Sequence, residues 1–291
     1  MKEPIKIVYV LGSDRSGGAL VDNTIARRSG IMQLGEVRLW PDFFTDDHLC
    51  SCGQRKTECD FWAPVIQNLS DFDRAHKNFE STKKPLFRFY LVLPSRLKKL
   101  FFRRVSGSFY ELYDEIRSIH GRDLMLDRSK SPAYGAALSQ IKGLDVVFVH
   151  IIRHPLGVIY SWKRHNKGIG HSTTNGSKTS LLKVAVKWNV TNLLCEIAKL
   201  RNPLKSINIQ YEDLGNPSLQ ELLMNQMELM KAGESQKPQN HLMFGEVGTD
   251  FIEAEFELNE EWRMGLSTFE KLLYGVITYP LYLFYLRKEK P

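Results

Sequence analysis

No apolar run in this chain is long enough to cross a membrane, although one segment near its end raises the question. Leu272 to Leu286 is apolar but shorter than the ~20 residues that a spanning helix needs, and Pro280 interrupts it. We expect a buried C-terminal helix there. The alternative is an interfacial segment beside Arg287 and Lys288, which would give peripheral membrane contact.

A secretion signal and abundant cysteine are lacking too. The first residues lead directly into a strand and a glycine turn, without the apolar region and small-residue cleavage site of a signal peptide. Only four cysteines occur, as is usual for proteins kept in a reducing compartment. These features predict a cytoplasmic protein.

Strong charge of either sign is also missing. Lysine and arginine number 40 against 33 aspartates and glutamates, so the net charge of +7 is a mild basic excess. This balance suits anionic ligands such as phosphates, and we expect no nucleic-acid partner from it. Neither an internal repeat nor a low-complexity tract divides the 291 residues, which suffice for one large domain.

Four segments have the composition of buried central strands. They are Lys6 to Leu11, Asp123 to Asp127, Asp145 to Ile152 and Ile207 to Tyr211. Each is followed by a segment with helical spacing, such as Leu181 to Leu200. Alternating strands and helices predict an α/β fold, in which a central parallel sheet lies between two layers of helices.

The alternation of strands and helices breaks between residues 48 and 120. Within this stretch, residues 83–104 are basic and aromatic and contain two prolines. We predict a single domain over residues 1–291, with 48–120 inserted as a cap of helices and loops that would bind an acceptor substrate. A solvated basic helix that packs its aromatic face on the domain is an equal alternative for residues 83–104.

The first predicted strand leads into a glycine turn and a helix, which is the layout of an anion site. Gly12 to Ala19 aligns with the nucleotide-triphosphate pattern GxxxxGK[ST], but Gly18 stands at the lysine position and Ala19 at the Mg²⁺-binding hydroxyl. The cation of this turn is Arg15 instead. A Mg²⁺-dependent kinase or NTPase is therefore disfavoured, and a tight connection without a ligand is a further alternative.

A second candidate anion site follows the strand at 145–152. Arg153 ends that strand, Pro155 starts a helix, and Ser161 lies about two turns along it. An arginine and a hydroxyl so placed would clamp a phosphate monoester. The alternative is an ordinary strand-to-helix turn with surface cations.

These two segments resemble the sulfotransferase superfamily that uses 3′-phosphoadenosine 5′-phosphosulfate, and bacterial members in particular. In that family a loop like GSxRSGST holds the 5′-phosphosulfate, and an arginine with a serine eight residues later holds the 3′-phosphate. The resemblance implies a P-loop-type sandwich and assigns donor binding to Arg15, Ser16, Gly17, Gly18, Ala19, Arg153, Ser161 and Tyr211. The product of the transfer would be 3′-phosphoadenosine 5′-phosphate.

Further stretches match the family in the same order along the chain. Gly35 to Arg38 is similar to the segment that carries the general base in tyrosylprotein sulfotransferases, and residues 127–134 are similar to a segment of heparan sulfate sulfotransferases. Other matches are Lys187 to Asn189, Tyr211 to Leu214, and the cysteine segment Cys50 to Trp62. We expect the acceptor to be a hydroxyl of a carbohydrate, a lipid or a small metabolite.

The resemblance also suggests catalytic roles. Glu36 is the candidate base for the acceptor hydroxyl, with His154 and His165 as competitors. Arg15 and Lys130 are the candidates to stabilise charge on the sulfuryl group, and because they would do the work of Mg²⁺, no metal is expected.

Departures from the family pattern keep other functions open. Gly18 and Ala19 replace the usual loop hydroxyls, His154 replaces an aspartate, and Glu246 to Thr249 replaces a segment with a final cation. A nucleotide-binding module without activity is therefore an alternative to the enzyme, and a small-molecule P-loop kinase is a second one.

Three of the four cysteines are clustered, at Cys50, Cys52 and Cys59. Their spacing lacks the paired C-x2-C of zinc ribbons, and Cys195 is far away in the sequence. We expect reduced structural thiols. A Cys₃His zinc site completed by His48 is the alternative.

Overall fold

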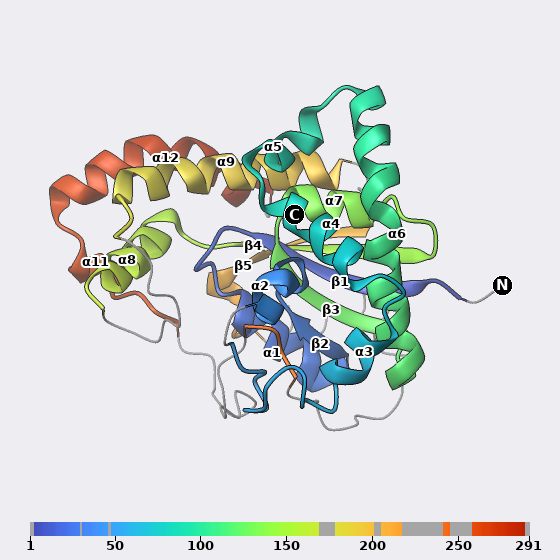
Figure 1. The fold of residues 1–291 in the computed structure, drawn as a ribbon. Helices are drawn as coiled ribbons and strands as arrows, with labels where there is room; N and C mark the ends of the chain where they lie inside the picture. The colour runs from blue at the N-terminus through green and yellow to red at the C-terminus, as the bar shows by residue number, and fades with distance from the viewer. Residues whose placement is uncertain are drawn as a thin grey trace.

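A five-stranded sheet lies at the centre of the computed structural model, which describes residues 3–29, 31–45, 48–168, 178–200, 205–216, 241–244 and 258–288 (Figure 1). The strand order is β2-β3-β1-β4-β5, and every neighbouring pair is parallel. The strands are β1 (Ile5–Gly12), β2 (Met32–Gly35), β3 (Leu124–Lys130), β4 (Leu144–Ile152) and β5 (Ser206–Gln210). The predicted α/β class and parallel sheet are confirmed.

Helices connect the strands in the described ranges. They are α1 (Gly18–Ser29), η1 (Val37–Leu39), α2 (Trp40–Thr45), α3 (Trp62–Asn68), α4 (Phe72–Lys83), α5 (Pro85–Arg88), η2 (Phe89–Val92), α6 (Ser95–His120), α7 (Pro132–Leu138), α8 (Pro155–Asn166), α9 (Leu181–Lys199), η4 (Tyr211–Asp213), α11 (Trp262–Gly265) and α12 (Thr268–Lys288). Proline occupies the first turn of α7 and of α8, where its missing N–H leaves no helical bond unmade.

The two faces of β1 enter two different cores because successive side chains of a strand point to opposite sides. Ile7 and Tyr9 belong to the larger core, which α6, α7 and α9 contact. Val8 and Val10 belong to a second core, where α1 contributes Val21. Helices therefore cover both faces of the sheet, as the alternation of strands and helices predicted.

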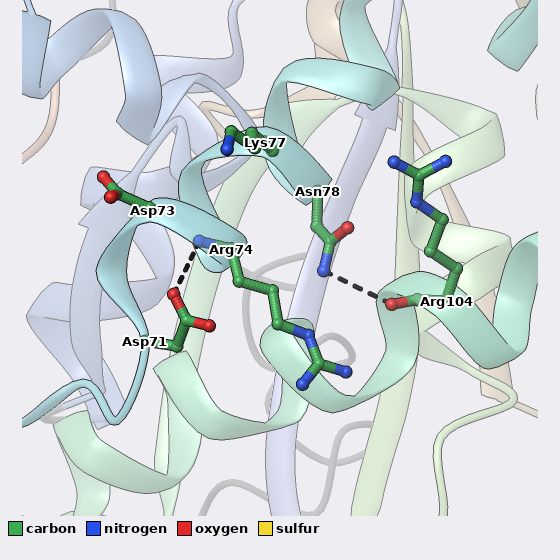
Figure 2. Close-up of a pocket in the computed structure, with 6 residues that line it drawn as sticks. All are labelled: Asp71, Asp73, Arg74, Lys77, Asn78 and Arg104. Atoms are coloured by element: carbon green, nitrogen blue, oxygen red, sulfur yellow. Dashed lines mark hydrogen bonds between the residues drawn. The ribbon is translucent and has the colours of Figure 1, made fainter.

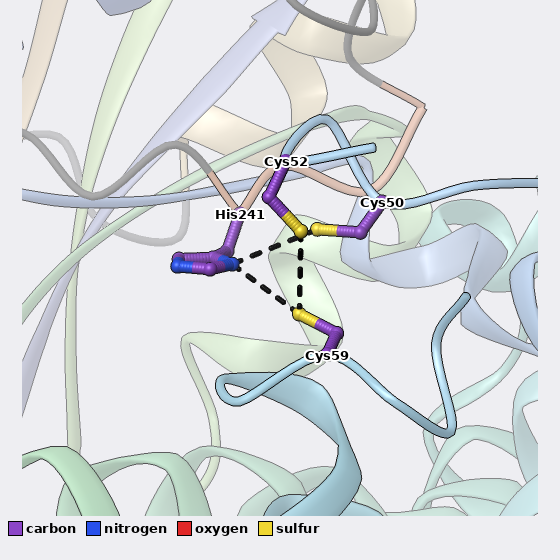
Figure 3. Close-up of side chains that lie close together, drawn as sticks. All are labelled: Cys50, Cys52, Cys59 and His241. Carbon is purple, nitrogen blue, oxygen red and sulfur yellow. Dashed lines mark hydrogen bonds between the residues drawn. The ribbon is translucent and has the colours of Figure 1, made fainter. Parts of the chain in front are cut away.

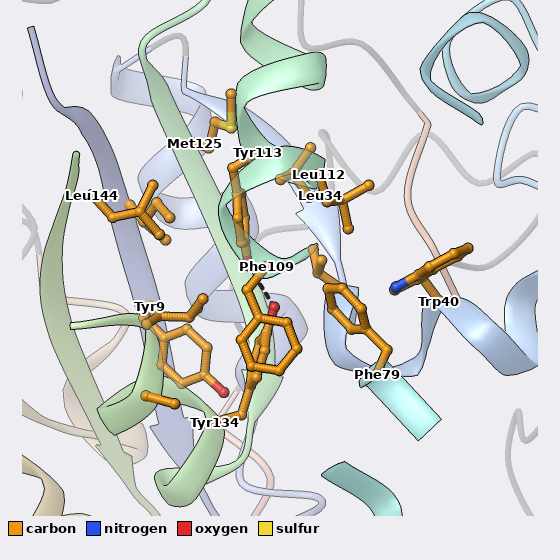
Figure 4. Close-up of a cluster of buried hydrophobic side chains, with 14 of the residues drawn as sticks. Tyr9, Leu34, Trp40, Phe79, Phe109, Leu112, Tyr113, Met125, Tyr134 and Leu144 are labelled. Atoms are coloured by element: carbon orange, nitrogen blue, oxygen red, sulfur yellow. Dashed lines mark hydrogen bonds between the residues drawn. The ribbon is translucent and has the colours of Figure 1, made fainter. Parts of the chain in front are cut away.

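The larger core joins the predicted cap to the sheet. Figure 4 shows Phe79 of α4 and Phe109 of α6 beside Tyr134 of α7, and the Phe109 and Tyr134 rings stand edge to face with centroids 5.0 Å apart. Between residues 83 and 104, Phe87 and Tyr90 are buried here while Leu86 and Leu100 stay 70% exposed. Part of this segment packs its aromatic side chains on the domain, and an acceptor-binding role for the rest stays a prediction.

The parallel register gathers the ends of the strands at one edge. Leu11 of β1 pairs with Lys130 of β3, and Gly12 of β1 pairs with Ile151 of β4. On the far side of β4, Ile152 pairs with Gln210 of β5. The loops that follow β1, β3, β4 and β5 therefore leave the sheet side by side.

The apolar segment near the chain end forms α12, which packs on α8 and α9. Tyr274 and Tyr285 are buried there, but Phe269, Leu272 and Val276 are about 70% exposed on another face. The expected helix is present, and it is only partly buried. Within the described ranges, no helix combines the length and apolar character needed to span a bilayer. Peripheral membrane contact stays a prediction.

Candidate functional site

The loop after β1 is held in a conformation that few side chains adopt. Arg15 and Gly17 have φ angles of 60° and 92°, in the left-handed region. Inside the loop the Ser16 hydroxyl donates a hydrogen bond to the carbonyl oxygen of Ser13 over 2.6 Å. This internal bond stabilises the turn. It also occupies the Ser16 hydroxyl, the one hydroxyl of this loop that the family resemblance assigned to binding 3′-phosphoadenosine 5′-phosphosulfate.

Both predicted anion segments meet at this loop. Nη1 of Arg153 donates to the carbonyl oxygen of Arg15 over 3.0 Å, and Nη1 of Arg15 lies 3.5 Å from Oγ of Ser161. The Arg15 guanidinium also lies over the Trp162 ring, 5.2 Å from its centroid. Arg15 thus forms one basic cluster with Arg153 and Ser161, which lie 138 and 146 residues further along the sequence.

Tyr211 stands between the two segments. Its ring lies under the Arg153 guanidinium, 4.2 Å from centroid to Cζ. The same ring covers Gly17 so closely that a Cβ there would come within 2.3 Å of Tyr211 Cδ2. Burial lowers the pKa of Arg153, although Tyr211 and Glu212 act in the opposite direction. A buried guanidinium stays protonated at neutral pH, so this is a desolvated positive charge.

Lys130 and Glu36 form the second half of the site. Gly18 has no side chain, and its missing Cβ makes room for Lys130, whose Cε would lie 2.9 Å from a Cβ there. Nζ of Lys130 is 3.7 Å from Oε1 of Glu36. Glu36 directly follows β2, whose four residues are all buried.

The described chain has three residues other than glycine with positive φ: Arg15, Lys130 and Phe244. A left-handed backbone costs such a residue about 1–3 kcal/mol, so the surrounding structure must enforce it. The first two are the cations predicted to act on the transferred group.

Three of the remaining predictions can be placed. Ala19 is exposed in the first turn of α1.

The two histidines considered as bases lie elsewhere. His154 donates its backbone N–H to Glu212, and its ring stacks on Trp262 with the two centroids 4.1 Å apart, among side chains of α11 and α12. Burial, together with Arg263 and Arg153, lowers the pKa of His154 to about 4. His165 lies edge to face with Trp162. Among the described residues, no hydrogen bond or ion pair joins either histidine to Glu36 or Lys130, whereas Glu36 lies beside Lys130.

Sequence reasoning missed several polar groups at this edge. Lys187 donates to Asp14 over 2.6 Å and so ties α9 to the loop after β1. Ser13 Oγ and the side-chain amide of Gln210 are buried without a hydrogen-bond partner among the described residues. Buried polar atoms of this kind mark places where a ligand or water completes the bonding. Lys187 belongs to the segment Lys187 to Asn189 that matches the family, but its contact with Asp14 was not predicted. Nothing in the sequence pointed to Gln210.

A buried carboxylate supports the strand that carries Lys130. Asp127 accepts hydrogen bonds from the backbone N–H of Ser129 over 2.7 Å and from the Tyr113 hydroxyl over 2.5 Å. Burial raises the pKa of Asp127 to about 6, against the hydrogen bonds from Ser129 and Tyr113. The Ser129 hydroxyl in turn accepts from the backbone N–H of Arg38, which fixes the residues after Glu36.

A pocket of about 400 Å³ opens elsewhere, between α4 and α6 of the predicted cap (Figure 2). Its lining is polar and of mixed charge, and Figure 2 shows Asn78 bonded to the carbonyl oxygen of Arg104. The lining residues are Asp71, Asp73, Arg74, Lys77, Asn78 and Arg104. None of them belongs to the predicted site at the sheet edge.

The clustered cysteines have a different neighbour from the one considered in the sequence. Cys50, Cys52 and Cys59 surround His241, with all four potential ligand atoms within 4.8 Å of one another. His48 lies against the Phe244 ring instead, 4.9 Å between centroids. The histidine of this set is therefore His241, not the His48 of the alternative considered from the sequence. His241 is 182 residues from Cys59, so spacing alone did not reveal it.

The remaining sequence prediction, the substitution at Glu246 to Thr249, lies outside the described residues. No family model and no curated protein matches this chain. A solved structure similar to it is a sulfotransferase domain from the curacin biosynthetic pathway. The likeness covers 94% of this chain and 91% of that one, with a TM-score of 0.46 and 17% identity. A likeness of this degree establishes neither a family nor an activity.

Proposed function

We propose that this protein is a sulfotransferase that moves a sulfuryl group from 3′-phosphoadenosine 5′-phosphosulfate to a hydroxyl of a carbohydrate, lipid or small metabolite. The observation that carries the proposal is the convergence of Arg15, Arg153 and Ser161 beside Tyr211 and Gly17. Two guanidinium groups and a hydroxyl at one sheet edge suit a ligand with phosphate groups at two positions.

The loop and α1 would hold the 5′ end of the donor. Backbone N–H groups at the start of a helix favour anions, and Arg15 adds a positive charge. Gly18 and Ala19 offer no hydroxyl, but Ser13 Oγ is buried and without a partner among the described residues, so it can donate in their place. Arg153 and Ser161 would hold the 3′-phosphate, next to the Tyr211 ring.

Glu36 and Lys130 would carry the transfer itself. Glu36 would accept the proton of the acceptor hydroxyl as the new sulfur–oxygen bond forms. Lys130 and Arg15 would stabilise the negative charge on the bridging and equatorial oxygens, which is the main demand of a loose transition state. Nζ of Lys130 lies 3.7 Å from Oε1 of Glu36, which supports the proposal that both side chains act on the same reacting group.

Isothermal titration calorimetry tests the donor class. We expect 3′-phosphoadenosine 5′-phosphate to bind and ATP with Mg²⁺ to bind far more weakly. Binding of ATP with Mg²⁺ but not of the 3′,5′-bisphosphate would overturn the proposal in favour of a P-loop kinase. Incubation of a metabolite extract with radiolabelled donor then tests turnover, since a module that only binds nucleotide would label nothing.

A further inference from the structure

Four side chains that commonly bind metals meet at the start of the predicted cap (Figure 3). Cys50 and Cys59 are fully buried, and Cys52 is the exposed member of the set. Figure 3 shows the three sulfur atoms turned toward the His241 imidazole. All four cysteines of the chain are free thiols in this structure.

Three of the distances within this cluster are close to those around a tetrahedral ion. Bonds of about 2.3 Å to sulfur and about 2.0–2.1 Å to nitrogen place sulfur atoms about 3.8 Å apart, and sulfur and nitrogen about 3.6 Å apart. Sγ of Cys52 is 3.7 Å from Sγ of Cys59. Nδ1 of His241 is 3.8 Å from Sγ of Cys50 and 3.3 Å from Sγ of Cys59. A disulfide would instead require about 2.05 Å between two sulfur atoms.

Hydrogen bonds and a ring contact hold the four side chains in this arrangement. Gly53 donates its N–H to the carbonyl oxygen of Cys50 over 2.8 Å, which closes a turn, and has a φ of 84° that favours glycine. Cys59 leads into α3, and its carbonyl oxygen accepts from the N–H of Ala63. Trp62 Nε1 donates to the carbonyl oxygen of His241 over 2.8 Å. The Phe61 ring stacks on the His241 ring at 5.3 Å.

We propose that Cys50, Cys52, Cys59 and His241 bind one Zn²⁺ ion, which fastens residues 241–244 to the start of the predicted cap. Zinc is the expected metal because thiolates and imidazole in a closed tetrahedral set are typical of structural zinc sites. The four protein ligands fill the coordination sphere, so this ion has no open position for catalysis. The proposal departs from the sequence-based expectation that the chain holds no metal.

The fastened segment lies against the candidate base. Met243 donates its N–H to the carbonyl oxygen of Leu34, and its own carbonyl oxygen accepts from the N–H of Glu36 over 3.3 Å. Gly35 forms a parallel bridge with Met243, and a Cβ at Gly35 would come within 2.2 Å of the Met243 oxygen. The ion would therefore hold the backbone that positions Glu36. This last consequence rests on the proposed function, whereas the metal site does not.

Metal analysis of the full chain tests the site directly. We expect about one zinc per chain after purification under reducing conditions, released when a thiol-specific mercurial is added. Replacement by Co²⁺ should give the intense visible bands of a tetrahedral thiolate centre. Absence of both zinc and Co²⁺ uptake would overturn the proposal, and so would a disulfide between any two of the three cysteines in the freshly purified chain.

Two histidine variants test the ligand assignment. His241→Ala should lose most of the zinc or release it at least tenfold faster to a chelator, while His48→Ala should keep it. The reverse pattern would overturn the assignment of His241. If His241→Ala does not fold, the Co²⁺ spectrum of the unaltered chain still decides whether a tetrahedral thiolate site exists.

The fastening role has its own measurement. Removal of the ion by a chelator should lower the Tm, and a Tm that does not change would contradict this role. We expect binding of 3′-phosphoadenosine 5′-phosphate to persist, since no contact between described residues links the cysteine cluster to Arg153. Zinc content does not depend on sulfuryl transfer, so a failure of the proposed function leaves the metal result interpretable.

Discussion

The guanidinium of Arg153 donates a hydrogen bond to the carbonyl oxygen of Arg15, 3.0 Å away, across 138 positions of sequence. The residue expected to bind the 3′-phosphate thus also supports the loop expected to bind the 5′-phosphosulfate. Arg153→Ala is the obvious test of 3′-phosphate binding. It would remove both the proposed contact with the 3′-phosphate and the hydrogen bond to the Arg15 carbonyl oxygen. Loss of nucleotide affinity in that variant alone would not separate the two roles.

Ser161→Ala separates them, because the Ser161 hydroxyl contacts the Arg15 side chain and leaves the Arg153 bond untouched. A hydrogen bond to a charged group contributes about 1.5–3 kcal/mol, so affinity for 3′-phosphoadenosine 5′-phosphate should fall by about 10- to 100-fold. Affinity for adenosine 5′-phosphate should stay the same. Calorimetry with both ligands checks this, and an equal loss for both would count against the clamp.

Glu36→Gln should abolish proton transfer while keeping the size of the side chain. Loss of a general base lowers the rate by roughly 10²–10⁴-fold, whereas the affinity for 3′-phosphoadenosine 5′-phosphate should not change. Transfer from radiolabelled donor onto the components of a metabolite extract measures the rate. Glu115→Gln on α6 is the matched control, since no described contact links Glu115 to the site. A Glu36→Gln variant with full activity would exclude Glu36 as the base.

Gly17→Ala should destabilise the protein and weaken nucleotide binding together. The new Cβ would lie 2.3 Å from the Tyr211 ring at a backbone φ of 92°, and we expect a loss of at least about 2 kcal/mol of unfolding free energy. The control is Gly107→Ala in α6, where no atom lies within 4 Å of the added Cβ. That variant should gain about 0.5–1 kcal/mol. Urea unfolding measures the stability of both variants. Equal free energies of unfolding would refute the close contact between Gly17 and the Tyr211 ring.

The stability of the protein should fall in mild acid partly because of His154. Its pKa is lowered from 6.5 to about 4, mainly by burial and then by Arg263 and Arg153, so the unfolded chain binds the proton first as the pH falls. The stability that comes from keeping His154 neutral is fully present above about pH 6.5 and is lost as the pH falls toward 4. Relative to His154→Asn, the native chain should lose about 1–2 kcal/mol between about pH 7.5 and pH 4.5, measured by urea unfolding. A constant difference between the two proteins over this range would rule out the effect.

Local sequence patterns predicted much of the fold. The predicted strand Lys6 to Leu11 became β1, one residue longer at each end, and Asp145 to Ile152 became β4, one residue longer at its start. Apolar continuity and the proline at the first turn of α8 are properties of neighbouring residues, so they are visible without tertiary structure. The short strand β2 was not among the four predicted strands, because only four residues form it.

The sequence by itself determined the α/β class and the residues that follow the strands, since these depend on short-range pattern. Tertiary structure decided which of those residues meet. The parallel register brings Lys130 beside Gly18 and the Tyr211 ring over Gly17. It also decided that His241, rather than His48, joins the cysteines. Contacts over 100 or more residues depend on how strands pair and helices pack, and no spacing in one sequence encodes that pairing.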